Sequence, residues 1–202
     1  MDRLVIATHN RKKAGEMVAI LGRRFPSLSI LTLEDYPGAP EPEETGKTYG
    51  ENATIKARSA ALATGEWCLA DDAGLEIDAL PGELEVWSKR FAGEETPFDV
   101  KMGIILDRMK DLAEPQRGAR FRCCVALSSP EGEAETFEAT CEGRIATEPS
   151  GGGGFGYDPI FWLPEMGCTM ADLTADQKHA VSHRGKVLAK LGDALAGRVP
   201  EF

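Results

Sequence analysis

The sequence predicts an α/β fold in which helices flank a mixed β-sheet. Apolar runs of strand length alternate with segments of helical period, two strands are joined directly by a turn, and the order departs from a strict βαβ repeat. The chain has 202 residues, of which 42% are hydrophobic, which is enough to bury a core. We therefore treat residues 1–202 as a single domain.

The N-terminal third is predicted to run strand, helix, strand, loop and helix. Residues 4–7 form an apolar run typical of a buried strand, and residues 28–33 predict a second one. Residues 34–46 are rich in Pro, Gly and Glu and predict a loop. The second helix begins at a capping box formed by Thr48 and Glu51. Apolar positions at helical spacing mark the packed faces of the two helices: Ala14, Met17, Val18 and Leu21, then Ala53, Ala57, Ala60 and Ala61.

Two carboxylates interrupt the next apolar segment. Residues 67–71 and 75–77 predict two short strands around the tetrapeptide Asp-Asp-Ala-Gly at 71–74. Asp71 and Asp72 are thus expected at a strand end. Neighbouring strand side chains point to opposite faces, so only one of the two is expected to face a site.

The C-terminal part is predicted to contain a helix, a long hairpin and two further helices. Residues 119–127 alternate as a half-buried strand, and the turn at 130–132 (Pro-Glu-Gly) leads into a strand at 134–145. Thr174 and Gln177 fit a second capping box. The first helix is marked by Phe98, Met102, Ile105, Met109 and Leu112, and the last follows a cap at Ser182 and carries Val187, Leu188, Leu191 and Leu195.

Composition excludes several functions. A net charge of -10 argues against binding nucleic acid through its phosphates, although a local group of lysines and arginines, helped by a divalent cation, suits a small polyphosphate. No segment is apolar enough for a membrane span and no signal peptide is evident, so we expect a cytoplasmic protein with no membrane partner. The cysteines form no CxxC pair and are odd in number, which favours reduced thiols and no zinc site: Cys68, Cys123, Cys124, Cys141 and Cys168.

A glycine-rich segment, residues 151–159 (Gly-Gly-Gly-Gly-Phe-Gly-Tyr-Asp-Pro), is the most informative motif. Glycines let the backbone approach a ligand closely, and the aromatic and basic residues that follow suit a flat anion such as a nucleotide. The alternative is a flexible linker, but the run leads directly into an aromatic and apolar stretch that linkers lack. The candidate residues are Phe155, Gly156, Tyr157, Asp158, Lys178, His183 and Arg184.

A polar and basic segment lies where the first strand passes into the first helix. Backbone N–H groups at a helix start attract phosphate, and cationic side chains add to that field. The Walker A spacing is absent, and the alternative is a solvated basic face. The candidates are Thr8, His9, Asn10, Arg11, Lys12 and Lys13, with Lys56 from the second helix.

Two acidic pairs supply the hard oxygen ligands that Mg²⁺ prefers. They are Glu43-Glu44 in the loop and Asp71-Asp72, and one carboxylate from each pair would suffice. For the loop pair the alternative is an ordinary acidic surface. We discount a metal site at His179 and His183, because a helix boundary at Ser182 separates them.

Taken together, these blocks resemble the inosine triphosphate pyrophosphatase family, also called the XTP/dITP diphosphatase family. The resemblance covers almost the whole chain, with six blocks in the family's order. It implies an elongated, two-lobed α/β fold with a cleft between the lobes, a homodimer, and Mg²⁺-dependent hydrolysis of noncanonical purine nucleoside triphosphates (ITP, dITP and XTP) to the monophosphate and pyrophosphate.

The resemblance also implies residue roles. Asp72 would be the general base and, with Glu43, would hold the metal. Ala73 would adjoin the substrate. The triphosphate would be held by Lys56 and by residues 8–13, and the base by Phe155 to Asp158, Lys178, His183 and Arg184. Arg184 would donate to the 6-oxo group and so disfavour adenine.

Three residues depart from the family pattern. His9 stands in place of the usual glycine, Ala73 in place of serine, and Lys89 in place of a small residue. These changes bear on rate and preference more than on reaction class. Two rival functions stay open: a Maf-like pyrophosphatase of pyrimidine or modified nucleotides, and a nucleotide-binding protein without activity.

Overall fold

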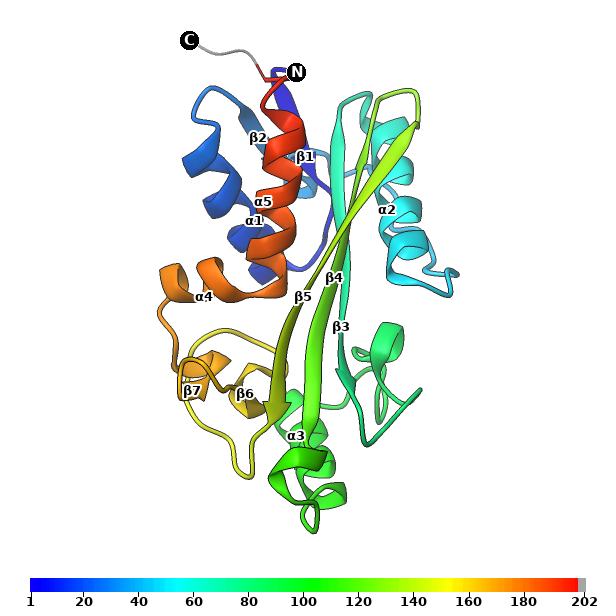
Figure 1. The fold of residues 1–202 in the computed structure, drawn as a ribbon. Helices are drawn as coiled ribbons and strands as arrows, with labels where there is room; N and C mark the ends of the chain where they lie inside the picture. Colours follow the sequence, from blue (N-terminus) through cyan, green and yellow to red (C-terminus); the bar gives the residue numbers. More distant parts are fainter. Residues whose placement is uncertain (200–202) are drawn as a thin grey trace. The chain divides into compact units, whose positions relative to one another are not determined.

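The computed structural model describes residues 1–199, and this part of the chain contains a seven-stranded sheet of order β2-β1-β3-β4-β5-β6-β7. β1 pairs in parallel with β2 and β3, whereas β6 pairs antiparallel with β5 and β7. The predicted mixed sheet is therefore confirmed (Figure 1). The strands are β1 (Arg3–Ile6), β2 (Ser29–Thr32), β3 (Cys68–Ile77), β4 (Gly118–Ser128), β5 (Ala134–Ile145), β6 (Phe161–Leu163) and β7 (Cys168–Thr169).

Five α-helices accompany the sheet in the described residues: α1 (Arg11–Arg24), α2 (Tyr49–Thr64), α3 (Phe98–Arg108), α4 (Ala175–Val181) and α5 (His183–Leu195). Local chemistry fixes their ends. The predicted capping boxes at Thr48 and Thr174 start α2 and α4, and Gly65, in the left-handed conformation, ends α2. α3 ends at Arg108, so the predicted helical face that included Leu112 is too long.

The chain divides into two compact units. Unit 1 comprises residues 1–72, 123–139 and those from 184 onward, and unit 2 comprises residues 73–122 and 140–183. In unit 1 the four predicted alanines of α2 pack against β1 and β3. In unit 2 the core joins α3 to the segments of β3, β4 and β5 that belong to this unit. It includes Leu75, Met102, Ile105, Phe121, Ile145, Ile160 and Phe161.

The prediction of two short strands around residues 71–74 is wrong. β3 is one strand of ten residues, and Asp71 and Asp72 lie in its middle. A strand continues through two acids here because each carboxylate meets partners on its own face of the sheet, so no turn is needed to bring them to solvent. β4 also differs from expectation, since it alternates only over its first half and is buried on both faces from Cys123 onward.

None of the helices in residues 1–199 combines the length and the apolar character needed to cross a lipid bilayer.

Candidate active site

Asp71 and Asp72 face opposite sides of β3. Asp71 contacts α1 and α5, whereas Asp72 contacts α2. Figure 1 shows the corresponding arrangement within unit 1, with α1 and α5 on one side of the strands and α2 on the other. The expectation that neighbouring side chains point apart is confirmed, and it gives the two acids different surroundings.

Asp72 is held by two side chains of α2. Asn52 Nδ2 donates to Asp72 Oδ2 at 3.1 Å, and Lys56 Nζ lies 3.7 Å from Asp72 Oδ1. Lys56 also pairs with Glu44 at 2.7 Å, so this lysine points toward carboxylates and not into solvent. Burial raises the pKa of Asp72, and the ammonium groups of Lys56 and Lys13 and the Asn52 hydrogen bond offset this only in part.

Asp71 is fully buried and lies in a group of charged side chains. Arg184 Nη2 donates to Asp71 Oδ2 at 2.8 Å, and Lys13 Nζ lies 3.3 Å from the same oxygen. Arg184 Nη1 donates to Glu16 at 2.8 Å. Burial alone would raise the pKa of Asp71, but Lys13, Arg184 and Lys56 together hold it far below its usual range.

The two neighbouring carboxylates thus have opposite protonation tendencies. Asp71 has a lowered pKa and pairs with two cations, whereas Asp72 has a raised pKa and sits beside an ammonium group. Environments that push the pKa values of a carboxylate pair apart are typical of acid–base sites. The arrangement therefore supports Asp72, and not Asp71, as the candidate general base.

The acidic loop places its two glutamates differently. Glu44 pairs with Lys56 beside Asp72, while Glu43 is exposed and its carboxylate makes no ion pair with any residue from 1 to 199. Glu43 is thus available for a ligand. The pKa of Lys56 is raised, because the attraction of Asp72, Asp71 and Glu44 outweighs the lowering caused by burial.

Sequence reasoning missed two residues of this cluster. Asn52 bonds Asp72, and Glu16 bonds Arg184. A signal for Asn52 was present, because it lies one helical turn before Lys56 on the same stripe of α2. Nothing local marks Glu16, whose partner is 168 residues away in the chain.

The basic segment before α1 is organised by Asn10. Its side-chain Oδ1 accepts from the backbone amides of Lys12 and Lys13, both at 3.1 Å. Its backbone amide donates to Thr8 Oγ1 at 3.2 Å. Two of the amides expected to attract phosphate are therefore already capped. Lys13 turns inward to Asp71.

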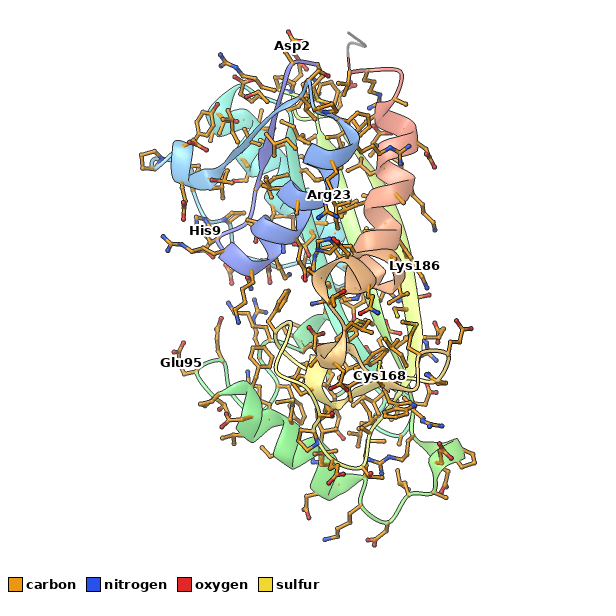
Figure 2. All side chains as sticks on the ribbon, turned by 90° about the vertical axis from the view of Figure 1, so that its left-hand side faces the viewer. Asp2, His9, Arg23, Glu95, Cys168 and Lys186 are labelled. Atoms are coloured by element: carbon orange, nitrogen blue, oxygen red, sulfur yellow. The ribbon has the colours of Figure 1, made fainter. Side chains whose placement is uncertain are left out.

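Two further members of this segment are exposed. Arg11 pairs with Glu34 at 2.8 Å. His9 lies on the loop between β1 and α1 and is exposed there (Figure 2). For Arg11, the support for the predicted phosphate-binding role is the positive charge of its side chain.

The glycine loop, which we define as residues 151–158, is built around a buried ion pair in unit 2. Lys178 Nζ donates to Asp158 Oδ2 at 2.7 Å, and the Phe155 amide donates to the same oxygen at 2.8 Å. Lys178 Nζ also lies 4.4 Å from the centre of the Phe155 ring. A Cβ on Gly154 would stand 2.0 Å from Asp158 Oδ2, and its φ of +67° disfavours any side chain. The loop is specifically packed, unlike a flexible linker.

Packing also occupies Tyr157 and His183. The Tyr157 hydroxyl donates to the Ser88 carbonyl at 2.7 Å, and its ring meets the Phe98 ring edge-on at 5.1 Å. Burial raises the pKa of Tyr157. The His183 ring stacks on Phe121 at 4.8 Å. Gly156 lies against Phe98, since a Cβ there would meet its ring at 3.7 Å.

The contacts of Arg184 in this structure are with carboxylates, and its role in reading a purine edge stays a prediction. Both of its terminal nitrogens donate to carboxylates, and the side chain is 2% exposed. A guanidinium committed to two buried carboxylates holds those groups in place. In this structure Arg184 therefore supports Asp71.

No group of three or more His, Cys, Asp or Glu side chains in residues 1–199 is arranged to hold a metal ion. The cysteines are free thiols, four of them buried.

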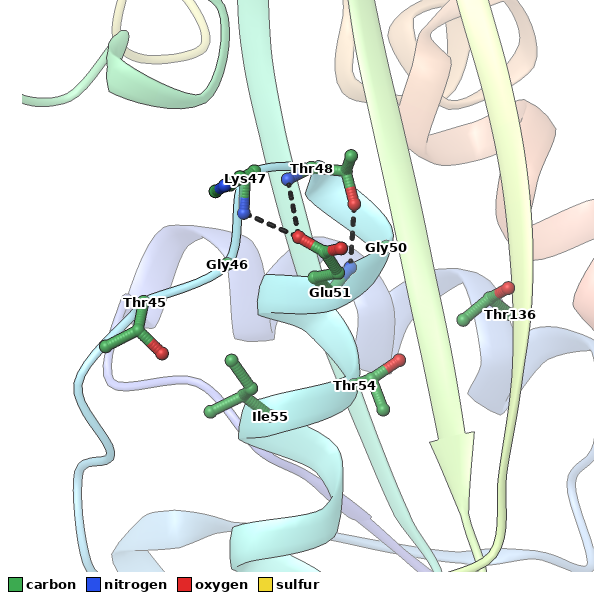
Figure 3. A pocket seen from close by; sticks show the side chains of 9 residues that line it. All are labelled: Thr45, Gly46, Lys47, Thr48, Gly50, Glu51, Thr54, Ile55 and Thr136. Atoms are coloured by element: carbon green, nitrogen blue, oxygen red, sulfur yellow. Dashed lines mark hydrogen bonds between the residues drawn. The ribbon is translucent and has the colours of Figure 1, made fainter.

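A shallow hollow of about 660 Å³ lies beside the start of α2 (Figure 3). None of the predicted site residues lines it. Its lining residues are Thr45, Gly46, Lys47, Thr48, Gly50, Glu51, Thr54, Ile55 and Thr136.

Comparisons with known proteins agree over nearly the whole chain. The Ham1 family model matches residues 4–194. Proteins described as dITP/XTP pyrophosphatases are similar: that of Halalkalibacterium halodurans is 47% identical over 95% of this chain and 97% of its own. That of Geobacter sulfurreducens is 47% identical over 96% of this chain and 97% of its own. The solved structure of a HAM1 protein from Coxiella burnetii superposes with a TM-score of 0.86 at 38% identity, covering 98% of this chain and 100% of that one.

Proposed function

This chain belongs to the Ham1 family, and we propose that it hydrolyses the noncanonical purine nucleoside triphosphates ITP, dITP and XTP to the monophosphate and pyrophosphate. The resemblance to the inosine triphosphate pyrophosphatase family is confirmed. The observation that carries the proposal is a pair of neighbouring aspartates on opposite faces of β3, one paired with Lys13 and Arg184 and the other beside Asn52 and Lys56, in a chain whose relatives are described as dITP/XTP pyrophosphatases.

In the proposed reaction Asp72 accepts a proton from water as the water oxygen attacks the α-phosphorus. A bond forms between that oxygen and phosphorus, the bond to the α,β-bridging oxygen breaks, and pyrophosphate leaves with the bridging oxygen. The raised pKa makes Asp72 a stronger base than an exposed carboxylate, which increases its value in general-base catalysis.

The carboxylate oxygens of Asp72 and of the acidic loop, whose Glu44 shares Lys56 with Asp72, are hard ligands of the kind that Mg²⁺ prefers. Glu43, whose carboxylate is exposed, and Asp72 would hold the ion. When bound, the ion would offset negative charge on the phosphate oxygens.

We assign the triphosphate to cationic side chains of unit 1. Lys13 and Lys56 are positioned by Asp71 and Asp72, while Arg11, Lys12 and the Thr8 hydroxyl add donors at the start of α1. The amides of Lys12 and Lys13 are used by Asn10, so side-chain charge contributes more here than helix-end amides.

We assign the purine base to the glycine loop. Phe155 offers a ring for stacking, with one face against the Lys178 ammonium group. Asp158 and Lys178 hold the loop in shape, and Tyr157 anchors it to Ser88. We further propose that the protein is cytoplasmic and that it forms a homodimer. Sedimentation at micromolar concentration would test the homodimer.

A turnover panel tests the proposal directly. Pyrophosphate release would be measured with Mg²⁺ for ITP, dITP, XTP, ATP, GTP, dTTP and UTP. We expect kcat/KM for ITP and XTP to exceed that for ATP by orders of magnitude. Preferred turnover of dTTP or UTP would instead support a Maf-like enzyme, and tight binding of ITP without turnover would support a nucleotide-binding protein.

A further inference from the structure

Two side chains of α2, one helical turn apart, both connect the acidic loop (residues 43–46) to Asp72. Lys56 pairs with Glu44 at 2.7 Å and lies 3.7 Å from Asp72 Oδ1. Asn52 accepts from the Gly46 amide at 2.8 Å through Oδ1 and donates to Asp72 Oδ2 at 3.1 Å through Nδ2. Lys56 connects the two through ion pairs, whereas Asn52 connects them through hydrogen bonds, which fix the orientation of the groups they join.

An amide side chain is the group that these two contacts require. The Gly46 amide needs an acceptor and the Asp72 carboxylate needs a donor, and asparagine supplies both from one buried side chain that is 3% exposed. Asparagine is otherwise a weak helix former. Its presence within α2 breaks a local preference, which is expected where a residue serves a site.

Close packing holds the acidic loop on this asparagine. A Cβ on Gly46 would lie 2.5 Å from Asn52 Oδ1 and 2.7 Å from Glu51 Cβ, so the loop approaches the helix as closely as glycine allows. The next two amides, of Lys47 and Thr48, donate to Glu51 Oε2 at 2.6 and 3.2 Å (Figure 3). The loop therefore has little freedom to move relative to α2.

We propose that Asn52 is a positioning residue that fixes the distance and orientation between Asp72 and the acidic loop that carries Glu43. By holding Asp72 Oδ2, it leaves Oδ1 on the side of Lys56. By holding the Gly46 amide, it keeps Glu43 within a fixed reach of that oxygen. This inference rests on the proposed function, in which Glu43 and Asp72 hold the metal and Asp72 activates water.

Two substitutions separate the two contacts of Asn52, and a third is a matched control. Asn52→Leu removes both contacts at similar size. Asn52→Asp keeps an acceptor for Gly46 but removes the donor and adds a like charge beside Asp72. Thr48→Ala removes the hydrogen bond from the Glu51 amide at the same helix end and has no contact with Asp72.

Four measurements are made on each protein: kcat and KM for ITP, Mn²⁺ affinity by electron paramagnetic resonance, thermal unfolding, and exchange of the Gly46 amide by NMR. Loss of a residue that orients a metal ligand typically costs about 10- to 100-fold in affinity or activity. We expect a loss of that size in kcat for both Asn52 variants and in Mn²⁺ affinity for Asn52→Leu, with KM for ITP within about threefold. Gly46 exchange should accelerate in Asn52→Leu and stay slow in Asn52→Asp.

The control decides between positioning and general loosening of the helix. We expect Thr48→Ala to keep kcat and Mn²⁺ affinity within about twofold of the unmodified protein, although it loses a cap. If Thr48→Ala matches the losses of the Asn52 variants, or if Asn52→Asp retains kcat, the proposal is overturned. Should Asn52→Leu not fold, Asn52→Asp carries the test alone.

Failure of the proposed function would be distinguishable. An unmodified protein that releases no pyrophosphate from any triphosphate would refute the activity, while Mn²⁺ affinity and Gly46 exchange would still report whether Asn52 orients Asp72 and the loop.

Discussion

At the scale of single residues, the middle of β3 shows how the two faces of one strand give identical side chains different chemistry. Asp71 faces Lys13 and Arg184 and is held ionised, and Asp72 faces Asn52 and Lys56 and has a raised pKa. On one face of the strand a carboxylate is paired with cations, and on the other face a carboxylate has the raised pKa that suits the proposed general base. Two substitutions test this division.

Asp72→Asn should remove activity without weakening the fold. Because the folded-state pKa of Asp72 is raised, the ionised carboxylate opposes folding at neutral pH, and a neutral amide removes that cost. Loss of a general base lowers kcat by about 10²- to 10⁴-fold. Steady-state kinetics and urea unfolding of the same preparation measure both effects, and near-normal turnover at saturating Mg²⁺ would show that another group is the base.

Asp71→Asn, unlike Asp72→Asn, should destabilise the folded protein strongly. The depressed pKa of Asp71 contributes stability above the unfolded value of about 3.9, and this contribution is lost as pH falls through the folded value. Removing one partner of a buried ion pair costs about 3–5 kcal/mol. Urea unfolding at pH 7 measures the loss, and an unchanged midpoint would contradict the role given to the pair with Arg184.

At the scale of elements, the glycine loop shows that a run of glycines can contain positions with different demands. A Cβ on Gly154 would collide with Asp158 and approach Lys178 to 3.2 Å, and φ there is +67°. A Cβ on Gly152 would meet nothing within 4 Å. The buried pair of Asp158 and Lys178 therefore requires glycine at position 154 and not at position 152.

Gly154→Ala should therefore raise KM for ITP and destabilise the protein, while Gly152→Ala should change neither. The left-handed backbone alone costs about 1–2 kcal/mol for alanine, and displacement of the buried pair adds to it. Kinetics with ITP and thermal unfolding of the two variants side by side provide the comparison. Equal effects of the two substitutions would mean that the loop acts as a plain linker.

At the scale of the whole molecule, each unit has its own core, and the described residues contain no group of three or more His, Cys, Asp or Glu side chains that could hold a metal ion. We therefore expect EDTA to abolish pyrophosphate release while leaving the unfolding temperature of the nucleotide-free protein unchanged. Mg²⁺ or Mn²⁺ should restore activity, as expected for hard oxygen ligands, with no need for zinc. Turnover that persists after exhaustive chelation would refute metal-assisted hydrolysis.

The sequence by itself determined what depends on near neighbours in the chain. Helix periodicity, the capping boxes at Thr48 and Thr174 and the turn between β4 and β5 need only a few adjacent residues, so their positions could be predicted. The mixed sheet followed from the order of these elements. The acidic and basic blocks also stood out, because charged residues next to apolar strands are chemically conspicuous.

Tertiary structure alone decided the role of each charge. Arg184 meets Asp71, 113 residues earlier, and Asn52 meets Asp72 across 20 residues. These pairings explain why β3 continues through two acids and why the two aspartates differ in pKa. A buried charge is stable only beside the partner that compensates it, and when that partner lies far along the chain, local sequence patterns do not reveal it.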